Sequence, residues 1–203
     1  MWLFIVLTVA VGYLLGNLNG AVCVSHMMKD DVRTHGSGNA GLTNFIRSYG
    51  ATHALLVVAV DALKAVAACL VGGFLMKSCG MYEEGKALGG FAVMLGHVFP
   101  AFLGFHGGKG ILSGFFVALL VDWRIALLIL AVFAVAYFAT GYVSLGSVLG
   151  SAGFGIGFAL FHHDNLIVLL CGITMSLLAI FMHRQNIVRL LKGEERKTNL
   201  FKK

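Results

Sequence analysis

The chain has 203 residues, of which 59% are hydrophobic and only 12% are charged, and its formal net charge is +6. Soluble domains carry about 25% charged residues, so this composition excludes an ordinary soluble enzyme and indicates a membrane protein. Nucleic acid is not expected as a partner, because the composition leaves no soluble domain to bind it.

Seven membrane-spanning helices are predicted, because about 20 apolar residues suffice to cross a bilayer. They are expected at 2–25, 51–76, 87–105, 108–122, 124–140, 146–161 and 166–183. The uncharged stretch 125–163 is too long for one helix and should break within 140–147, where glycine and serine interrupt the apolar pattern. The span at 108–122 is short, because Lys109 and Asp122 flank only 12 uncharged residues. A tilted or re-entrant helix is the alternative there.

The distribution of basic residues predicts the orientation of the spans. With the N-terminus outside, eleven Lys and Arg residues fall on the inner side and three on the outer side, as the positive-inside rule requires. The inner residues are Lys29, Arg33, Arg47, Lys109, Arg184, Arg189, Lys192, Arg196, Lys197, Lys202 and Lys203. The outer residues are Lys77, Lys86 and Arg124. The all-α fold is therefore expected to have its N-terminus outside and its C-terminus in the cytoplasm.

No metal or cofactor site is expected. The four cysteines, Cys23, Cys69, Cys79 and Cys171, show neither CxxC spacing nor a histidine at ligand spacing, which disfavours a zinc site or a disulfide framework. The segment GFHGGKG (104–110) is not a Walker A nucleotide-binding loop. That loop has one more residue before its second glycine and a serine or threonine after its lysine.

Four polar stretches fall at the expected cytoplasmic ends of the spans. They are HGSGNAGLTNFIR (35–47), GFHGGKG (104–110), GYVSLGS (141–147) and HRQNIVRLLKGEERK (183–197). Together they supply glycine-exposed backbone N–H groups, hydroxyls, amides and cations, whereas carboxylates are nearly absent before Glu194. Clustered donors of this kind favour an anion with many oxygens, such as a phosphate.

In this order, the polar stretches resemble the motifs of the PlsY family, the bacterial acyl-phosphate:glycerol-3-phosphate acyltransferases. The family pattern GSGNxGATNxxR aligns with 36–47, GHxFPxFLxFxGGKG with 96–110, and HxxNIxRLxxGxExK with 183–197. The resemblance extends from about Tyr13 to Lys197. Two sites depart from the family pattern: GNLN (16–19) replaces an early G-S-[IL]-P, and Leu42 replaces alanine.

The resemblance implies one membrane-embedded acyltransferase domain over 1–203, in the bacterial cell membrane, with its active site on the cytoplasmic face. It implies that a fatty acyl group passes from an acyl phosphate to the sn-1 hydroxyl of glycerol 3-phosphate. The products would be lysophosphatidic acid and inorganic phosphate, for phospholipid synthesis. Membrane lipids and the enzyme that makes the acyl phosphate are the other expected partners. A membrane transporter or channel for a phosphorylated or other small anion is the alternative.

The resemblance also implies the site residues. Ser37, Lys109, His183 and Asn186 are expected to be catalytic. The expected substrate-binding residues are Gly36, Gly38, Asn39, Gly41, Thr43, Asn44, Arg47, Gly107, Gly108, Gly110 and Ser144. Glycines let the backbone approach a phosphate closely, and an arginine can clamp a phosphate with two parallel hydrogen bonds while a lysine offers a compact charge.

The acceptor of the hydroxyl proton stays open between three candidates. His26 and Asp31 fit an H-x4-D pattern, and an unperturbed histidine such as His183 titrates near neutrality. The oxygens of the acyl phosphate itself are the preferred candidate, because the cationic cluster contains no evident carboxylate base.

Two charged residues, Asp61 and Lys64, fall inside the second span. Their i, i+3 spacing predicts that they pair with each other, because charges within a membrane are costly unless paired. A proton or ion path is the rival interpretation. His97, in the third span, is expected to make structural hydrogen bonds near Pro100.

Overall fold

The computed structural model describes residues 1–198, and all regular secondary structure in this part of the chain is helical. The elements are α1 (Trp2–Gly16), α2 (Gly20–Met27), η1 (Val32–Thr34), α3 (Leu42–Tyr49), α4 (Ala54–Lys77), α5 (Tyr82–Val98), η2 (Ala101–Leu103), α6 (Ile111–Val121), α7 (Trp123–Thr140), α8 (Val143–Phe161), α9 (Leu166–Met182) and α10 (Arg184–Leu191). The predicted all-α class is confirmed for these residues.

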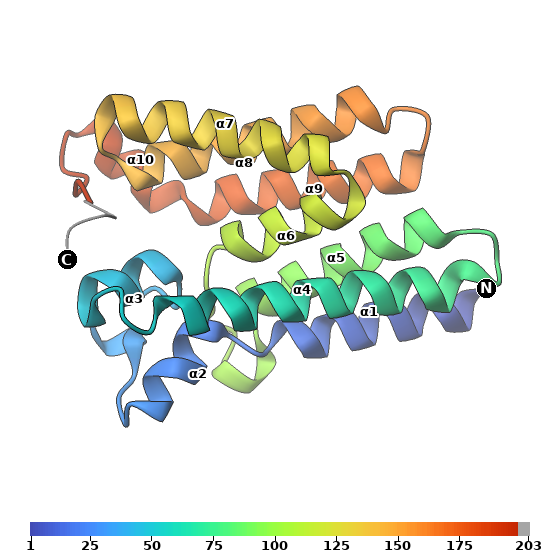
Figure 1. Cartoon of the computed structure of the whole chain (residues 1–203), viewed down its shortest axis with the longest axis horizontal. Helices are drawn as coiled ribbons and strands as arrows, with labels where there is room; N and C mark the ends of the chain where they lie inside the picture. The colour runs from blue at the N-terminus through green and yellow to red at the C-terminus, as the bar shows by residue number, and fades with distance from the viewer. Residues whose placement is uncertain (199–203) are drawn as a thin grey trace.

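The long helices form two layers, with α6 between them (Figure 1). In one layer α1 and α4 pack on α5, and in the other α8 packs against both α7 and α9. Helix α6 contacts α4 and α5 on one side and α7 on the other. The short helices α2, α3 and α10 gather at one end of the molecule, opposite the N-terminus (Figure 1).

Five helical segments are long and apolar enough to cross a membrane. They are Trp2–Met27, Ala54–Lys77, Tyr82–Leu103, Trp123–Thr140 and Val143–Phe161. A sixth is the pair α9 and α10, which is bent by 53° at its break. Helix α6 is apolar but has only 11 residues, so it is about 17 Å long against a hydrocarbon core of about 30 Å. The described residues thus contain five or six helical segments that could cross a membrane. A seventh crossing would require the short helix α6 to span the bilayer.

The first predicted span is interrupted where it was expected to be continuous. Residues Asn17 to Asn19 separate α1 from α2, and both asparagine side chains are buried. Asn17 accepts a hydrogen bond from the backbone N–H of Phe102 (3.0 Å). Asn19 caps α2 by accepting from the N–H of Val22 (3.1 Å) and donates to the carbonyl of Ala40 (2.9 Å). The break therefore ties the first span to two loops that lead into the polar end.

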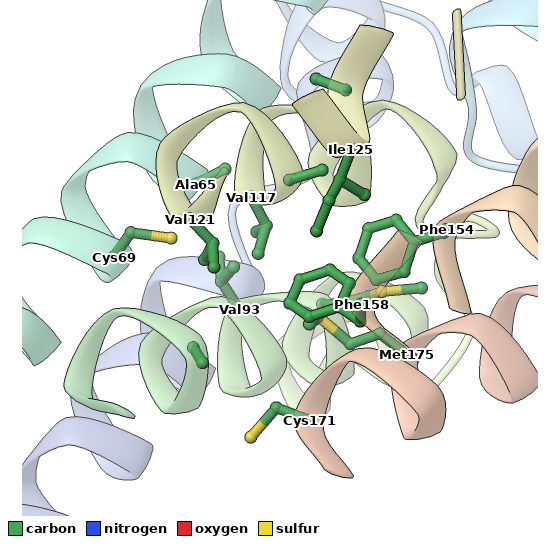
Figure 2. Packing of buried hydrophobic residues seen from close by; sticks show 14 of the residues in the cluster. Ala65, Cys69, Val93, Val117, Val121, Ile125, Phe154, Phe158, Cys171 and Met175 are labelled. Carbon is green, nitrogen blue, oxygen red and sulfur yellow. The ribbon is translucent and has the colours of Figure 1, made fainter. Parts of the chain in front are cut away.

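The main hydrophobic core lies between the two layers. In Figure 2, Phe154 and Phe158 of α8 lie beside Met175 of α9, and Ile125 of α7 faces them. A second, smaller core holds the polar end together, with Phe45 of α3 packed among residues of α2 and α4.

The two ends of the molecule differ in charge. Nine of the eleven basic residues expected on the inner side are described, and Lys202 and Lys203 lie outside the described residues. The described ones occupy η1, α3, α10 and the loops beside α2, α6 and α10, whereas Lys77, Lys86 and Arg124 lie on the ends of α4, α5 and α7 that face away from α10 (Figure 1).

Candidate active site

A cavity of about 380 Å³ opens at the end where α3, α10 and the loop before α6 meet. Eleven of the fifteen expected site residues line it. These are Ser37, Asn39, Gly41, Thr43, Asn44, Arg47, Lys109, Gly110, Ser144, His183 and Asn186. The remaining four, Gly36, Gly38, Gly107 and Gly108, are not part of its lining.

The loop before α3 is shaped by Asn44, whose buried side chain braces it from inside. Asn44 Oδ1 accepts from the N–H of Ser37 (2.9 Å), and Nδ2 donates to the carbonyls of Val32 (3.0 Å) and His35 (3.1 Å). Gly36 turns the chain with φ +59°, a conformation that favours glycine. Asn44 thereby holds Ser37 at the cavity, and its own hydrogen bonds are used within the loop.

The loop before α6 carries Lys109 against the end of α5. The carbonyl of His97 accepts from the N–H of Gly108 (3.1 Å). A Cβ on Gly107 would lie 2.0 Å from that carbonyl oxygen, and one on Gly108 would lie 2.2 Å from His97 Nε2. The two glycines therefore permit this close approach, which leaves Lys109 as the only long side chain of the GGKG segment facing the cavity.

Cations dominate the mouth of the cavity. Lys109 Nζ donates to Asn186 Oδ1. Burial, reinforced by the positive charge of Arg189, lowers the pKa of Lys109 to about 8, although Glu195 opposes the shift. Burial likewise lowers the pKa of Arg47 from its ordinary value, and the guanidinium stays charged at neutral pH. The carboxylate of Glu195 also lies at this mouth, where it accepts hydrogen bonds from Arg189 Nε (2.8 Å) and Asn186 Nδ2 (3.2 Å).

His183 is held in one tautomer by a backbone contact. Its Nδ1 lies 2.8 Å from the carbonyl oxygen of Ala179. Because a carbonyl can only accept, Nδ1 must carry the proton, and Nε2 of the neutral ring is left as an acceptor. The buried imidazole therefore suits a partner that donates, such as a hydroxyl group.

Ser144, at the start of α8, offers a hydroxyl to the cavity. Its Oγ is buried and has no hydrogen-bond partner among residues 1–198. Buried polar groups are nearly always paired, so this hydroxyl is suited to a ligand in the cavity.

Sequence reasoning missed three residues at the mouth. Arg189 and Glu195 lie within the aligned stretch 183–197, so the motif itself was the signal that could have identified them. Thr198 lies beyond the motif, yet its Oγ1 accepts from Arg47 Nε (2.8 Å). Arg47 also donates to the carbonyl of Arg196 (3.2 Å). The segment after α10 thus runs across the guanidinium expected to clamp a phosphate.

The His26 and Asp31 pair is not part of the cavity lining. His26 Nε2 lies 3.7 Å from Asp31 Oδ2, and Asp31 is held more closely by Arg33, whose Nη2 lies 2.7 Å from the same oxygen. Hydrogen bonds from Arg33 lower the pKa of Asp31 to about 2. The structure therefore gives this pair a local role in shaping the segment around η1.

The predicted pairing of Asp61 with Lys64 is confirmed, with Lys64 Nζ 2.7 Å from Asp61 Oδ1. Lys64 Nζ also lies 2.7 Å from His97 Nδ1 and donates to the carbonyl of Leu18 (2.7 Å) at the break after α1. His97 makes structural hydrogen bonds as expected, with Lys64 through its ring and with Gly108 through its carbonyl. This buried cluster connects α4, the α1–α2 break and the loop that carries Lys109.

Within 1–198, no three His, Cys, Asp or Glu side chains gather as a metal site. The lining that could hold an anionic group consists of Lys109, Arg47 and Arg189 with the donors of Ser37, Ser144 and Asn186.

Comparison with known proteins gives one consistent family. The family model described as glycerol-3-phosphate acyltransferase matches residues 6–193. A glycerol-3-phosphate acyltransferase of Thermoanaerobacter pseudethanolicus (strain ATCC 33223 / 39E) is 42% identical over 96% of each chain. One from Neisseria meningitidis serogroup C is 36% identical and covers 96% of this chain and 98% of its own.

Solved structures show the same similarity. The crystal structure of PlsY, an integral membrane glycerol 3-phosphate acyltransferase, in its glycerol 3-phosphate form superposes with a TM-score of 0.87 and 32% identity, covering 98% of this chain and 99% of that one. Its lysophosphatidic acid form gives a TM-score of 0.84 with 31% identity over 97% and 96% of the two chains.

Proposed function

This chain belongs to the glycerol-3-phosphate acyltransferase family, and we propose that it uses an acyl phosphate as its donor. It is an integral membrane enzyme that acylates glycerol 3-phosphate to give lysophosphatidic acid. With an acyl phosphate donor, the acyl group passes to the sn-1 hydroxyl and the second product is inorganic phosphate. Residues 1–203 act as one membrane-embedded domain.

The observation that carries the proposal is the two-part lining of one continuous cavity. Its mouth combines Lys109, Arg47 and Arg189 with neutral donors, which suits phosphate groups. Its inner part is lined by apolar side chains that include Phe133, Phe154 and Met175. An acyl phosphate has the same two parts, a charged head and an apolar chain, and the second substrate adds another phosphate to the mouth.

The mechanism requires positioning and charge stabilisation more than a strong base. The sn-1 hydroxyl oxygen attacks the acyl carbonyl carbon, the carbon–oxygen bond to the phosphate breaks, and the hydroxyl proton leaves with the phosphate as hydrogen phosphate. Lys109 would stabilise the negative charge that develops on the departing phosphate. His183 Nε2 and Asn186 would orient the hydroxyl, consistent with the acceptor left free on the histidine ring.

Six further expected site residues have supporting roles in this proposal. Asn44 and the glycines at 36, 38, 107 and 108 would shape the two loops, because they position backbone or neighbouring side chains outside or at the edge of the cavity. Ser144 would donate its unpaired hydroxyl to a phosphate or carbonyl oxygen.

Purified protein in detergent should release phosphate from an acyl phosphate only when glycerol 3-phosphate is added. Lysophosphatidic acid should form in equal amount, which chromatography measures. A transporter or channel would instead carry the anion into proteoliposomes without consuming it. Phosphate release that does not depend on glycerol 3-phosphate would contradict the proposed acyl transfer.

We also propose seven crossings, with α6 as a short one, the N-terminus outside and the active site facing the cytoplasm. The charge difference between the two ends of the molecule supports this orientation. The start of α1 and the helix α10 lie at opposite ends of the long axis, which fits an odd number of crossings (Figure 1).

A membrane-impermeant thiol reagent added to intact cells should label Cys79, in the turn after α4, because that turn is expected outside. It should not label a Lys192→Cys variant in which Cys79 is replaced by serine, because α10 ends in the cytoplasm. Permeabilised cells provide the control, since both thiols should then react. The reverse pattern in intact cells would invert the proposed topology.

A further inference from the structure

We propose that Phe154 sets the longest acyl chain that the cavity accepts. The inference rests on the proposed function, since it takes the inner part of the cavity as the place of the acyl chain. Phe154 would then be a specificity-determining residue for the acyl donor.

Helix α8 presents a narrow face of small residues to the cavity. Gly146, Ser147, Gly150 and Ser151 line it, and their i, i+1, i+4, i+5 spacing places them on one side of the helix over two turns. The next residue on this face is Phe154. The small side chains leave room for a chain to run along the helix, and the phenyl ring ends that room.

Two of the serine hydroxyls that line this part of the cavity, Ser151 of α8 and Ser176 of α9, already donate their protons within the protein. Ser151 Oγ donates to the carbonyl of Ser147 (2.7 Å), and Ser176 Oγ of α9 donates to the carbonyl of Ser151 (2.6 Å). Glycines and these two internally bonded hydroxyls can border a methylene chain without leaving their own donors unpaired.

The length of this wall is limited. Ser144, at the mouth, and Phe154 are ten positions apart on one helix, which corresponds to about 15 Å. A chain longer than this must bend, leave the cavity sideways or displace Phe154.

Phe154 cannot move aside easily, because it is part of the main core. Its side chain is almost fully buried, and its ring lies 5.0 Å from the ring of Phe158 one turn further along α8. Met175 of α9 lies beside both rings, and Ile125 of α7 closes the other side (Figure 2). Displacing the ring would disturb close-packed neighbours, so the end wall is firm.

Gly114 of α6 faces the same end of the cavity and offers a way to shorten it. A Cβ there would lie 3.8 Å from Phe154 Cε2 and 3.7 Å from Met94 Sδ, both ordinary contact distances. A Cβ is therefore accommodated at this position, and a longer side chain would extend from it into the space next to the phenyl ring.

The test compares kcat/KM for octadecanoyl phosphate and dodecanoyl phosphate, with glycerol 3-phosphate saturating. Phe154→Ala should raise the octadecanoyl-to-dodecanoyl ratio by about tenfold, as expected if roughly two more methylenes become buried. Gly114→Leu should lower the ratio, and the double variant should return it toward the wild-type value.

Phe158→Ala is the matched control, because it removes the same ring one turn away at a residue that does not line the cavity. It should lower the melting temperature without changing the ratio. An unchanged ratio in Phe154→Ala, or an equal shift in Phe158→Ala, would overturn the assignment of Phe154. If the wild-type protein consumed neither acyl phosphate, the proposed donor itself would fail, so the two failures are distinguishable.

Discussion

Replacing Lys109 with alanine should lower kcat/KM for acyl transfer by about ten- to hundredfold, the effect of losing one charge-assisted hydrogen bond. Lys109 is the cation of the loop before α6, and its Nζ lies at the cavity mouth beside Asn186. Arg47 and Arg189 remain in the variant, but neither of them extends from the glycine loop before α6 to the position of Lys109 Nζ beside Asn186. Steady-state kinetics with purified protein, together with an unchanged melting temperature, would measure the loss.

Lys109→Arg complements the alanine variant, because it keeps the positive charge and changes the geometry of the hydrogen-bond donors. It should restore only part of the activity, because a planar guanidinium does not replace a compact ammonium in a tight glycine loop. Its pH profile should also differ. The pKa of Lys109 is lowered to about 8 by burial, so its charge is present below that pH and lost above it.

The wild-type kcat/KM should therefore fall as the pH rises through about 8, because this parameter reports the free enzyme. In Lys109→Arg the decline should move to higher pH, since arginine stays protonated. Near-normal kinetics in the alanine variant, or an alkaline limb that persists unchanged in the arginine variant, would remove Lys109 from the proposed role.

The long helices could be predicted because the bilayer imposes a simple length requirement on apolar sequence. The short helix α6 could not be settled in the same way. Lys109 and Asp122 limit its uncharged length, and the helix itself covers only 111–121. Whether so short a helix crosses depends on the neighbours that cover its ends, which a count of apolar residues does not describe.

The break between α1 and α2 was missed for a related reason. Asn17 and Asn19 carry no charge, so a count of apolar residues does not detect them, yet Asn17 donates to the carbonyl of Tyr13 at the end of α1 and Asn19 accepts from the N–H of Val22 at the start of α2. The departure from the family pattern at 16–19 was visible in the sequence. Its consequence, a contact with the carbonyl of Ala40 beside the loop before α3, depends on which distant loop comes near.

The mouth of the cavity was largely predictable because its residues lie on motifs at the ends of helices that meet at one end of the fold. Two features of the mouth could not be predicted from the sequence. The carboxylate of Glu195 was not expected among phosphate-binding cations, although it is held there by Arg189 and Asn186. Substrate contact by the glycines of the motifs stays a prediction, and the sequence did not reveal that Gly107 and Gly108 also allow the loop to lie against His97.

Asp61→Ala should destabilise the protein by about 3–5 kcal/mol, the usual effect of removing one partner of a buried ion pair. Both side chains are almost fully buried, at 2% and 1% exposed for Asp61 and Lys64. Without the carboxylate, the ammonium would face only neutral groups, the ring of His97 and the carbonyl of Leu18. The melting temperature in detergent should fall by roughly 10 °C, given about 2–4 °C per kcal/mol for a chain of this size.

The double variant Asp61→Ala/Lys64→Met separates the charge from the shape of the site. It removes both ions, so it should be more stable than Asp61→Ala alone, because the cost lies mainly in the unpaired charge. Rescue should be incomplete, since His97 Nδ1 and the carbonyl of Leu18 lose their donor. His97 also holds the N–H of Gly108 beside Lys109, so the double variant should keep its fold while its kcat/KM stays reduced. A double variant no more stable than Asp61→Ala would show that the unpaired charge is not the main cost. Full activity in the double variant would show that the loop carrying Lys109 is positioned without this cluster.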